Sequence, residues 1–493
     1  MPRPAARHIP RPAAMFDREV EWSDLVAFAT QEQAGATLGV VSGRRRQGKT
    51  FLLDSLAQAA EGFYFQAVES TETVSLHSLG TALGRHRGIG PLRLANWDEA
   101  VDELLALGSE RSLPVVIDEF PYLARQNSAL PSIIQAAYGP RRSQRLASRT
   151  RLLLCGSAIS FMGGLLSGSA PLRGRASLDL VVHSLDFRQA AEFWGIDDLR
   201  LAALTHAVVG GTPAYRDFVN GDAPDSMADF EPWIERAVLN PSSSLYREAR
   251  YLLAEEPDLR DRALYSAVLS AIAAGNHTRS GVTNYVGRPA TDLTHVLKVL
   301  EDCGLLQIEP DAFRNNRNTY RIAEPLLTFH HAVMLPSLTH IERRRPRLAW
   351  QQNQRQFECA VLGPHFEAMC REWVSAFASP ETFGGLPTEV RSGVVSDPKG
   401  RASHEVDVVV HGIVGQDPGI LLSVGEVKWH REMGLRDLDR LRHILVLLEA
   451  RGMDTAHARP ACFSGGGFSP ELLDAGRRGE VILVDLERLY RGE

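Results

Sequence analysis

The chain has 493 residues, a formal net charge of −6, 44% hydrophobic residues and 23% charged residues. This length exceeds that of one ordinary domain, so we expect two to four domains. The acidic balance excludes a protein that is basic throughout, so any nucleic-acid contact must use local patches, and no apolar run approaches the length of a membrane span.

The N-terminal stretch differs in composition from the rest of the chain. Residues 1–15 are rich in proline, arginine and alanine and lack the apolar segment of a signal peptide, so we expect a disordered tail. The five cysteines are odd in number and scattered, without the spacing of a metal site. They indicate reduced thiols, and we expect a cytoplasmic protein.

A glycine-rich loop follows the first apolar strand. The strand is expected at 38–42 and a helix at 51–60, and the loop before the helix reads GRRRQGKT. This order is typical of a phosphate-binding loop, whose backbone N–H groups surround phosphates at a helix N-terminus. The predicted nucleotide-binding residues of the loop are Gly43, Arg44, Arg45, Arg46, Gln47, Gly48, Lys49, Thr50 and Phe51. We expect Lys49 to reach the β- and γ-phosphates and Thr50 to bind Mg²⁺.

A second apolar strand, within 113–120, ends in two acidic residues. Asp118 is expected to hold the Mg²⁺ of the nucleotide through water, and Glu119 to polarise the attacking water. A third strand at 151–157 ends at Ser157, which either senses the γ-phosphate or simply caps the strand.

Two arginines follow on a loop. Arg173 and Arg175 are either fingers that act on the nucleotide of a neighbouring subunit, which implies a homo-oligomer, or surface arginines.

These motifs together resemble the AAA+-related ATPases of the archaeal and bacterial ATPase family within the STAND class. The matching stretches, in order, are FDRE (16–19), GRRRQGKT (43–50), IDEFPYL (117–123), LLLCGSA (152–158), LRGRA (172–176) and GGTP (210–213). The resemblance implies ATP as the nucleotide, a parallel-sheet P-loop core at 16–187 and a helical lid at 188–257, with Pro213 near the nucleotide. Ala158 stands where many relatives have a second serine. Because of this departure, the resemblance does not support a γ-phosphate-sensing role for Ser157.

The middle of the chain predicts three helices and a hairpin. Helices are expected at 263–272, at 278–285 and at 292–303, the last capped by Thr291, followed by strands at 304–308 and 318–322. This is the order of a winged helix-turn-helix, which the resembled family also carries, and we assign it to 258–340.

Such a domain either contacts DNA or only transmits the nucleotide state. The candidate DNA contacts are His295, Lys298, Arg314, Arg317 and Arg321. The basic stretch at 341–356 is predicted to be a linker.

Lysine is scarce in this chain, which has four lysines against fifty arginines. Two of the four, Lys49 and Lys428, lie in motifs that require a compact ammonium group. Lys428 belongs to the stretch GEVKW at 425–429, at the end of a predicted strand at 420–429. Because side chains alternate along a strand, Glu426 and Lys428 share one face.

Residues 357–493 predict an α/β domain around this pair. A helix at 357–377 carries Glu367, and a strand at 404–410 carries Asp407. The set resembles the PD-(D/E)xK nuclease superfamily, in which carboxylates hold one or two divalent metals and the lysine positions or activates water. Glu367, Asp407 and Glu426 would be the metal ligands, and Asp407, Glu426 and Lys428 the catalytic residues. The alternative is a surface Glu–Lys pair, or a correctly folded but inactive module.

The leading hypothesis is therefore an ATP-controlled, metal-dependent nuclease of α/β multidomain fold, suited to genome defence or control of mobile elements. Its expected cofactors are ATP and Mg²⁺, with Mn²⁺ possible at the nuclease site, and its expected partner is nucleic acid, with DNA favoured. The alternative is an ATP-dependent switch that binds DNA or protein partners and cleaves nothing. No membrane contact is expected.

Overall fold

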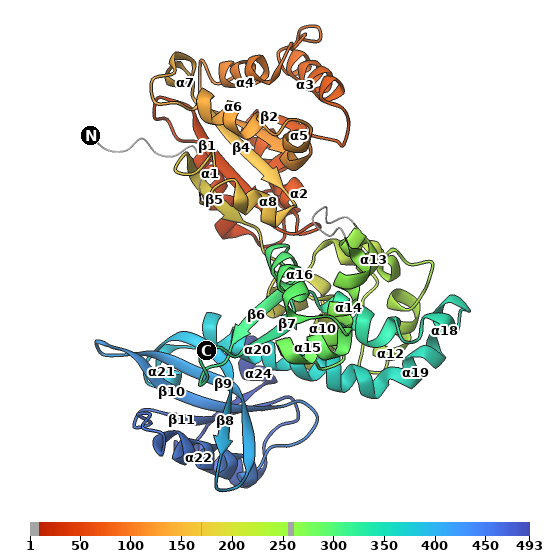
Figure 1. The fold of residues 1–493 in the computed structure, drawn as a ribbon, viewed down its shortest axis with the longest axis vertical. Helices are drawn as coiled ribbons and strands as arrows, with labels where there is room; N and C mark the ends of the chain where they lie inside the picture. Colours follow the sequence, from red (N-terminus) through yellow and green to blue (C-terminus); the bar gives the residue numbers. More distant parts are fainter. Residues whose placement is uncertain (1–8, 169, 255–260) are drawn as a thin grey trace. The chain divides into compact units, whose positions relative to one another are not determined.

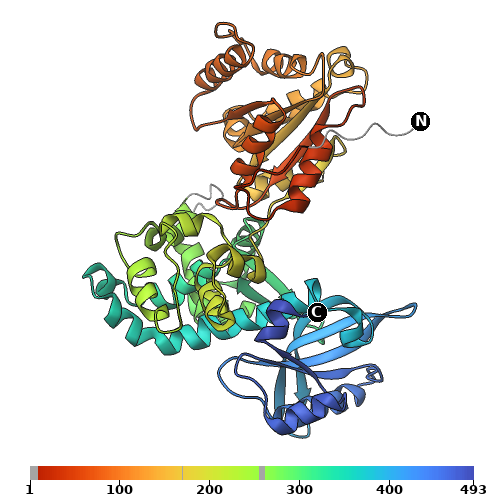
Figure 2. The ribbon, with the colours of Figure 1, turned by 180° about the vertical axis from the view of Figure 1, so that it is seen from behind.

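The computed structural model of the chain describes residues 9–168, 170–254 and 261–493. It divides into two compact units, Met1–Ser184 and Leu185–Glu493. Figures 1 and 2 show the chain from opposite sides. Among the described residues, no helix combines the length and the apolar character needed to cross a membrane.

A five-stranded parallel sheet forms the centre of the first unit (Figure 1). The strand order is β2-β3-β4-β1-β5. The strands are β1 (Thr37–Ser42), β2 (Phe63–Gln66), β3 (Leu113–Asp118), β4 (Thr150–Gly156) and β5 (Ala176–Val181). The helices are α1 (Glu19–Ala29), α2 (Lys49–Ala59), α3 (Glu72–His86), α4 (Trp97–Ala106), α5 (Phe120–Gln126), α6 (Leu130–Ala137), α7 (Ser143–Ala147) and α8 (Ile159–Gly164). The three strands and the helix predicted around the glycine-rich loop are confirmed.

Both faces of this sheet are covered, as continuous apolar strands require. Side chains alternate between two cores: Val40 packs in the core beneath α3 to α6, whereas Val41 packs in the core that α1 and α2 share. The second core also contains Ile9 and Met15, and the Trp22 ring nitrogen donates a hydrogen bond to the Ile9 carbonyl (3.1 Å). The predicted disordered tail is therefore wrong for residues 9–15, because apolar side chains anchor them; residues 1–8 of that prediction lie outside the described residues.

The second unit begins with a helical region. Its elements are α9 (Phe187–Trp194), α10 (Leu199–Val209), α11 (Ala214–Phe218), α12 (Phe230–Trp233), the π-helix η1 (Ile234–Val238), α13 (Ser244–Ala254), α14 (Arg262–Ala273), α15 (Arg279–Val286), α16 (Ala290–Asp302), β6 (Leu306–Pro310), β7 (Asn318–Ile322), α17 (Pro325–Phe329), the π-helix η2 (His330–Met334), α18 (Leu338–Glu342) and α19 (Pro346–Gln356). Strands β6 and β7 pair antiparallel. Three helices and a hairpin therefore lie where they were predicted, whereas the predicted boundary at 257/258 falls outside the described residues.

Two local predictions in this region are wrong. Thr291 does not cap α16; Pro289 precedes the helix in an extended conformation (φ −57°, ψ 147°), and Thr291 lies in the first turn. The stretch predicted as a linker is largely α19, whose Ala349 and Trp350 are buried. The linker prediction rests on the basic residues of 343–347, whereas the apolar residues that follow them form the buried face of α19.

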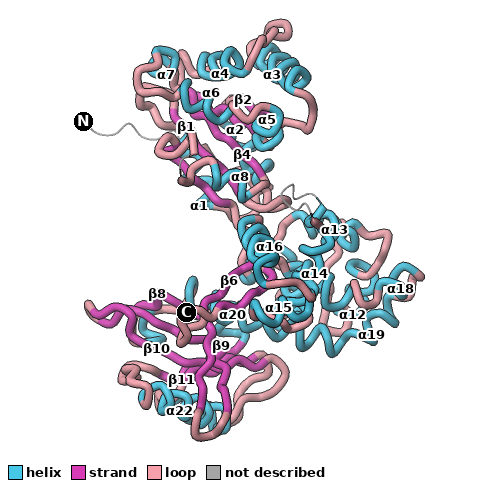
Figure 3. The backbone as a smooth tube through the Cα atoms, in the orientation of Figure 1, coloured by secondary structure: helices cyan, strands magenta, loops and turns pink. Residues whose placement is uncertain are grey.

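A mixed five-stranded sheet ends the chain, with order β12-β11-β10-β9-β8 (Figure 3, magenta strands). Strands β8, β9 and β10 pair antiparallel, and β10, β11 and β12 pair parallel. The strands are β8 (Leu386–Asp397), β9 (Ala402–Val414), β10 (Asp417–Lys428), β11 (Arg459–Ser464) and β12 (Ile482–Asp485). The helices are the π-helix η3 (Phe357–Leu362), α20 (Gly363–Ala376), α21 (Pro380–Phe383), α22 (Leu435–Glu449), α23 (Pro470–Arg477) and α24 (Leu486–Arg491).

Helices cover this sheet on both faces. Trp373 of α20 packs with Phe463 on one face, and Leu441 of α22 packs with Val424 on the other. The first of these cores continues into the helical region, since the Phe187 and Tyr490 rings meet edge to face at 5.1 Å. The helical region and the sheet therefore form one compact unit, and the domain boundaries predicted within it stay predictions.

Candidate nucleotide site and carboxylate cluster

The glycine-rich loop joins β1 to α2 in the first unit. Gly43 (φ +148°) allows no side chain, because a Cβ there would lie 2.3 Å from the Val182 carbonyl oxygen. Gly48 (φ +88°) has open space around it, so its backbone conformation alone favours glycine. It ends the loop directly before α2, where free N–H groups and the helix dipole favour a phosphate.

Lys49 is held inside this loop. Its side chain is buried, and its Nζ donates a hydrogen bond to the Arg44 carbonyl oxygen (2.7 Å). Burial lowers the pKa of Lys49, while Cys155, Glu119 and Asp118 nearby oppose this shift. An anion within the loop would favour the charged ammonium.

Asp118 and Thr50 bring two oxygen atoms together beside the loop. The Thr50 hydroxyl donates to Asp118 Oδ2 at 2.8 Å, and the Tyr64 hydroxyl donates to the same oxygen at 2.8 Å. Hydroxyl and carboxylate oxygens suit Mg²⁺, so this pair fits the ion predicted here. Tyr64 lies on β2 next to β3, a neighbour that the local sequence pattern does not reveal.

Glu119 follows Asp118 in a left-handed conformation (φ 54°). Its two carboxylate oxygens lie 3.3 and 3.2 Å from the Ser157 hydroxyl, at the end of the adjacent strand β4. Ser157 thus contacts the predicted catalytic carboxylate, and its role toward a phosphate stays a prediction.

Arg18 is a loop contact that sequence reasoning did not assign, although it lies in the FDRE stretch. Its side chain is buried and donates to the carbonyl oxygens of Gln47 (3.4 Å) and His183 (2.8 Å). Arg18 therefore joins the loop to the strand end after β5.

Within the described parts of the chain, four other predicted residues form no side-chain hydrogen bond or ion pair with Lys49, Thr50, Asp118 or Glu119. Phe51 is 48% exposed on α2. Arg173 is exposed and donates to the Gly168 carbonyl (2.6 Å), and Arg175 is half-buried. Pro213 belongs to the second unit, at the start of α11. Their roles stay predictions.

In the second unit, β9 and β10 place Asp407 beside the Glu426–Lys428 pair. Asp407 Oδ2 accepts a hydrogen bond from the Val427 N–H (2.8 Å). Lys428 Nζ lies 2.5 Å from Glu426 Oε1, and Arg440 of α22 pairs with Glu426 Oε2. The predicted strand pairing and shared face are thus present, but both Glu426 oxygens have a cation as partner.

Glu367 lies on α20 near these residues. Burial and the Asp407 carboxylate raise the pKa of Glu367 to about 8, against the effects of Arg371 and Lys428. Arg371 Nη1 lies 4.0 Å from Glu367 Oε2 and donates to the Asp407 carbonyl oxygen (3.0 Å). Burial also raises the pKa of Asp407.

Arg371 and Arg440 are cluster residues that sequence reasoning missed. Arg371 follows Glu367 by one helical turn, so the i, i+4 spacing could have revealed it. Arg440 reaches the cluster through the packing of α22, for which the sequence holds no local signal.

The carboxylates of Glu367, Asp407 and Glu426 lie in the same region, but their oxygen atoms are not all within 4.8 Å of one another. Within the described residues, one group of three has its ligand atoms within 4.8 Å of one another, and it is a different one: Asp397, His404 and His443. A shared ion at the predicted cluster would require its side chains to move closer together.

Four of the five predicted DNA contacts have partners within the chain. Lys298 pairs with Glu301 (3.1 Å) and Asp302 (2.8 Å) on the exposed side of α16. Arg321 pairs with Glu309 (2.7 Å). Arg317 lies 3.9 Å from Asp311, Arg314 donates to the Ser396 hydroxyl, and His295 is exposed.

The hairpin loop also packs against the C-terminal sheet, where the Ala312 N–H donates to the Ser392 carbonyl (2.9 Å). The tip of the predicted wing therefore contacts the C-terminal sheet within the second unit.

Comparisons with known proteins find distant similarity. No family model matches the chain. An uncharacterised protein of Methanocaldococcus jannaschii is 26% identical over 307 residues, 62% of this chain and 65% of that protein, so the match covers less than two thirds of its length.

Solved structures are similar at lower identity. A Walker-type ATPase of Pyrococcus abyssi is 21% identical, with a TM-score of 0.49, 66% of this chain and 99% of that chain covered. The ORC2 protein of Aeropyrum pernix, in its ADPNP–ADP complexes, is 16% identical, with a TM-score of 0.41, 68% of this chain and 96% of that chain covered. These likenesses assign the chain to no family.

Proposed function

We propose that the chain binds and hydrolyses ATP in its first unit. The observation that carries this proposal is the joint geometry of the glycine-rich loop, the buried Lys49 inside it and the Thr50–Asp118 contact of 2.8 Å. These features bring backbone N–H groups, an ammonium and two oxygen ligands to one helix N-terminus.

Each residue has a distinct task in this proposal. Lys49 would exchange its bond to the Arg44 carbonyl for phosphate oxygens, and Thr50 and Asp118 would hold Mg²⁺. The ion, when bound, would neutralise phosphate charge. Glu119 orients and polarises the attacking water, and Ser157 holds the Glu119 carboxylate in place.

Nucleotide binding and turnover by purified protein test this proposal. Lys49→Ala is expected to weaken ATP binding at least tenfold, because a desolvated ammonium–phosphate contact is lost. Lys399→Ala, another of the four lysines and exposed, serves as the control and should bind as wild type. Equal ATP affinity of Lys49→Ala and wild type would refute the site.

For the second unit, we propose a metal-dependent phosphodiester-cleaving site whose activity the ATPase unit controls. Its support is the placement of Asp407 and Glu426 on neighbouring strands, with Lys428 2.5 Å from Glu426. Glu367, Asp407 and Glu426 would hold the metal ions, which supply a nucleophilic hydroxide. Lys428 would position the water. DNA is the favoured substrate, and defence against foreign DNA is the favoured context.

The second candidate is an ATP-dependent switch with an inactive C-terminal domain. Two observations favour it: Arg440 and Lys428 occupy both oxygens of Glu426, and the three carboxylates do not meet around one point. The ion pairs of Lys298 and Arg321 also favour a structural role for the helix–hairpin region.

Cleavage of labelled single- and double-stranded DNA and RNA, with Mg²⁺ or Mn²⁺ and with or without ATP, separates the two candidates. Under the nuclease proposal, Asp407→Asn removes cleavage and Lys49→Ala changes it. Asp417→Asn, at the exposed start of β10, is the matched control. Cleavage by Asp407→Asn at the wild-type rate, or ATP hydrolysis without any cleavage, would favour the switch.

A further inference from the structure

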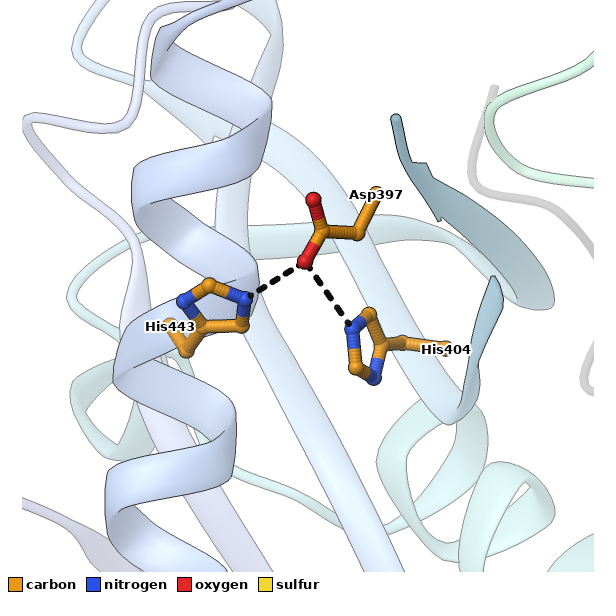
Figure 4. Close-up of side chains that lie close together, drawn as sticks. All are labelled: Asp397, His404 and His443. Atoms are coloured by element: carbon orange, nitrogen blue, oxygen red, sulfur yellow. Dashed lines mark hydrogen bonds and ion pairs between the residues drawn. The ribbon is translucent and has the colours of Figure 1, made fainter. Parts of the chain in front are cut away.

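Three side chains outside both proposed sites converge in the C-terminal sheet. Asp397 is the last residue of β8, His404 lies on β9 and His443 on α22. Figure 4 shows the Asp397 carboxylate between the two imidazole rings. Asp397 Oδ2 lies 3.4 Å from His443 Nε2 and 4.0 Å from His404 Nε2. One ligand atom from each residue falls within 4.8 Å of the others.

The fold itself brings these residues together. Strands β8 and β9 pair antiparallel with Val395 opposite His404, so Asp397 and His404 are diagonal neighbours on one sheet face. Helix α22 covers that face, where Val395 and Val406 share a core with Leu441. His443 precedes the buried Ile444 of α22 and is half-exposed, and its ring still reaches Asp397, so it lies at the edge of this packed interface.

The hydrogen bonding around the trio leaves ligand atoms available. Asp397 Oδ1 accepts a hydrogen bond from the Gly400 N–H (2.8 Å), whereas Asp397 Oδ2 faces the two histidines. His404 Nε2 is buried without a hydrogen-bond partner. A buried polar atom without a partner destabilises the fold unless a ligand satisfies it.

We propose that Asp397, His404 and His443 bind one divalent transition-metal ion of the Zn²⁺ class, with water at the remaining position. Imidazole nitrogen and carboxylate oxygen are preferred Zn²⁺ ligands, whereas Mg²⁺ prefers oxygen alone. Two atoms bound to a tetrahedral Zn²⁺ lie about 3.3 Å apart, given bonds of about 2.0 Å. The Asp397–His443 distance of 3.4 Å already matches this value, whereas the Asp397–His404 distance of 4.0 Å must shorten by about 0.7 Å.

Solvent access is compatible with metal entry. The His443 side chain is 49% exposed, whereas the side chains of His404 and Asp397 are 22% and 11% exposed. The ion would cross-link the β8–β9 hairpin to α22, the helix that also carries Arg440. None of its three residues belongs to the carboxylate cluster or to the nucleotide loop, so the proposal stands apart from both proposed functions.

Zn²⁺ and Co²⁺ binding to the full chain, stripped of metal with a chelator, tests the proposal. Wild type is expected to bind one Zn²⁺ tightly and to give the visible absorption of tetrahedral Co²⁺. His404→Ala and His443→Ala should lose this binding at least a hundredfold, and Asp397→Asn, which keeps the side-chain shape, at least tenfold. His457→Ala, an exposed histidine of the same region, should bind as wild type. Asp407→Asn should also keep the tight site, which separates it from the carboxylate cluster.

A second readout distinguishes ligand loss from misfolding. Without metal, Asp397→Asn and wild type should show similar circular dichroism, and Zn²⁺ should raise the unfolding temperature of wild type more than that of Asp397→Asn. Zn²⁺ affinity and thermal shift that are the same in wild type, His404→Ala and His443→Ala would overturn the proposal, as would absence of Zn²⁺ binding by wild type.

Discussion

Lysine and arginine have different roles at the two proposed sites. Lys49 contacts a single carbonyl oxygen at 2.7 Å, and Lys428 contacts a single carboxylate oxygen at 2.5 Å. Arg371 instead joins the Asp407 carbonyl to Glu309, and Arg440 joins Glu426 to the Glu405 carbonyl. A guanidinium bridges several acceptors with its planar fork, whereas an ammonium makes a compact point contact. The two lysines therefore occupy positions where the shape of the cation matters.

Lys49→Arg tests whether this position requires a compact ammonium or only a positive charge. The variant keeps the charge, but the longer planar group does not fit a buried position that is 6% exposed. We expect ATP hydrolysis to fall about a hundredfold, as on loss of a preorganised electrostatic contact. Steady-state turnover at saturating ATP measures this. Turnover within twofold of wild type would show that charge alone suffices at this position.

Glu119 and Ser157 are predicted to act on turnover more than on binding. Glu119→Gln keeps the size of the side chain and one acceptor oxygen but removes the base, so the rate should fall about a hundredfold or more. Ser157→Ala removes only the contact that orients Glu119, and about a tenfold loss is expected. Comparing kcat with the ATP dissociation constant of each variant checks this. A Glu119→Gln protein that hydrolyses ATP normally would contradict the assignment.

At the scale of single elements, the two threonines near the predicted helix starts make a matched pair. The Thr278 hydroxyl accepts a hydrogen bond from the Gly281 N–H (3.2 Å) at the start of α15. Thr291 lies inside α16 and caps nothing. Thr278→Ala is therefore expected to destabilise the second unit by about 1 kcal/mol, and Thr291→Ala by less than about 0.5 kcal/mol. Urea unfolding measures both, and equal effects would refute the cap.

The same two threonines show when a local sequence pattern is enough to predict the start of a helix. Thr278 precedes a helical pattern with no competing start signal, so its cap could be predicted. At the next helix, the extended Pro289 begins the helix earlier than the threonine suggests. Strand ranges and the Glu426–Lys428 face were also predictable, because alternation is a local property.

Contacts that depend on packing between elements could not be predicted. Tyr64 reaches Asp118 only because β2 pairs with β3, and Arg440 reaches Glu426 only because α22 covers the sheet. Asp397, His404 and His443 are separated by 7 and 39 residues along the chain, a spacing typical of no metal motif. Their proximity follows from strand pairing and helix packing together.

At the scale of the whole molecule, buried histidines should make stability depend on pH. Burial lowers the pKa of His330 to about 4 and that of His331 to about 3. Both are buried, and along the chain they lie between the core residues Phe329 and Ala332 of the second unit. In the unfolded chain each histidine binds a proton near pH 6.5. The unfolded state therefore binds more protons between pH 6.5 and the folded pKa, and stability falls as pH falls through this window.

The expected decrease is up to about 1.4 kcal/mol per pH unit for each such histidine. Carboxyls such as Glu367, whose pKa is raised to about 8, contribute with the opposite sign, because their contribution to the stability of the fold is lost as pH rises. The difference between wild type and His331→Gln therefore isolates one histidine. Urea unfolding is monitored by tryptophan fluorescence at pH values from 7 to 5. The free energy of unfolding should depend less steeply on pH in His331→Gln than in wild type. The exposed His457→Ala should keep the wild-type slope, and identical slopes for wild type and His331→Gln would show that His331 is not held neutral by the fold.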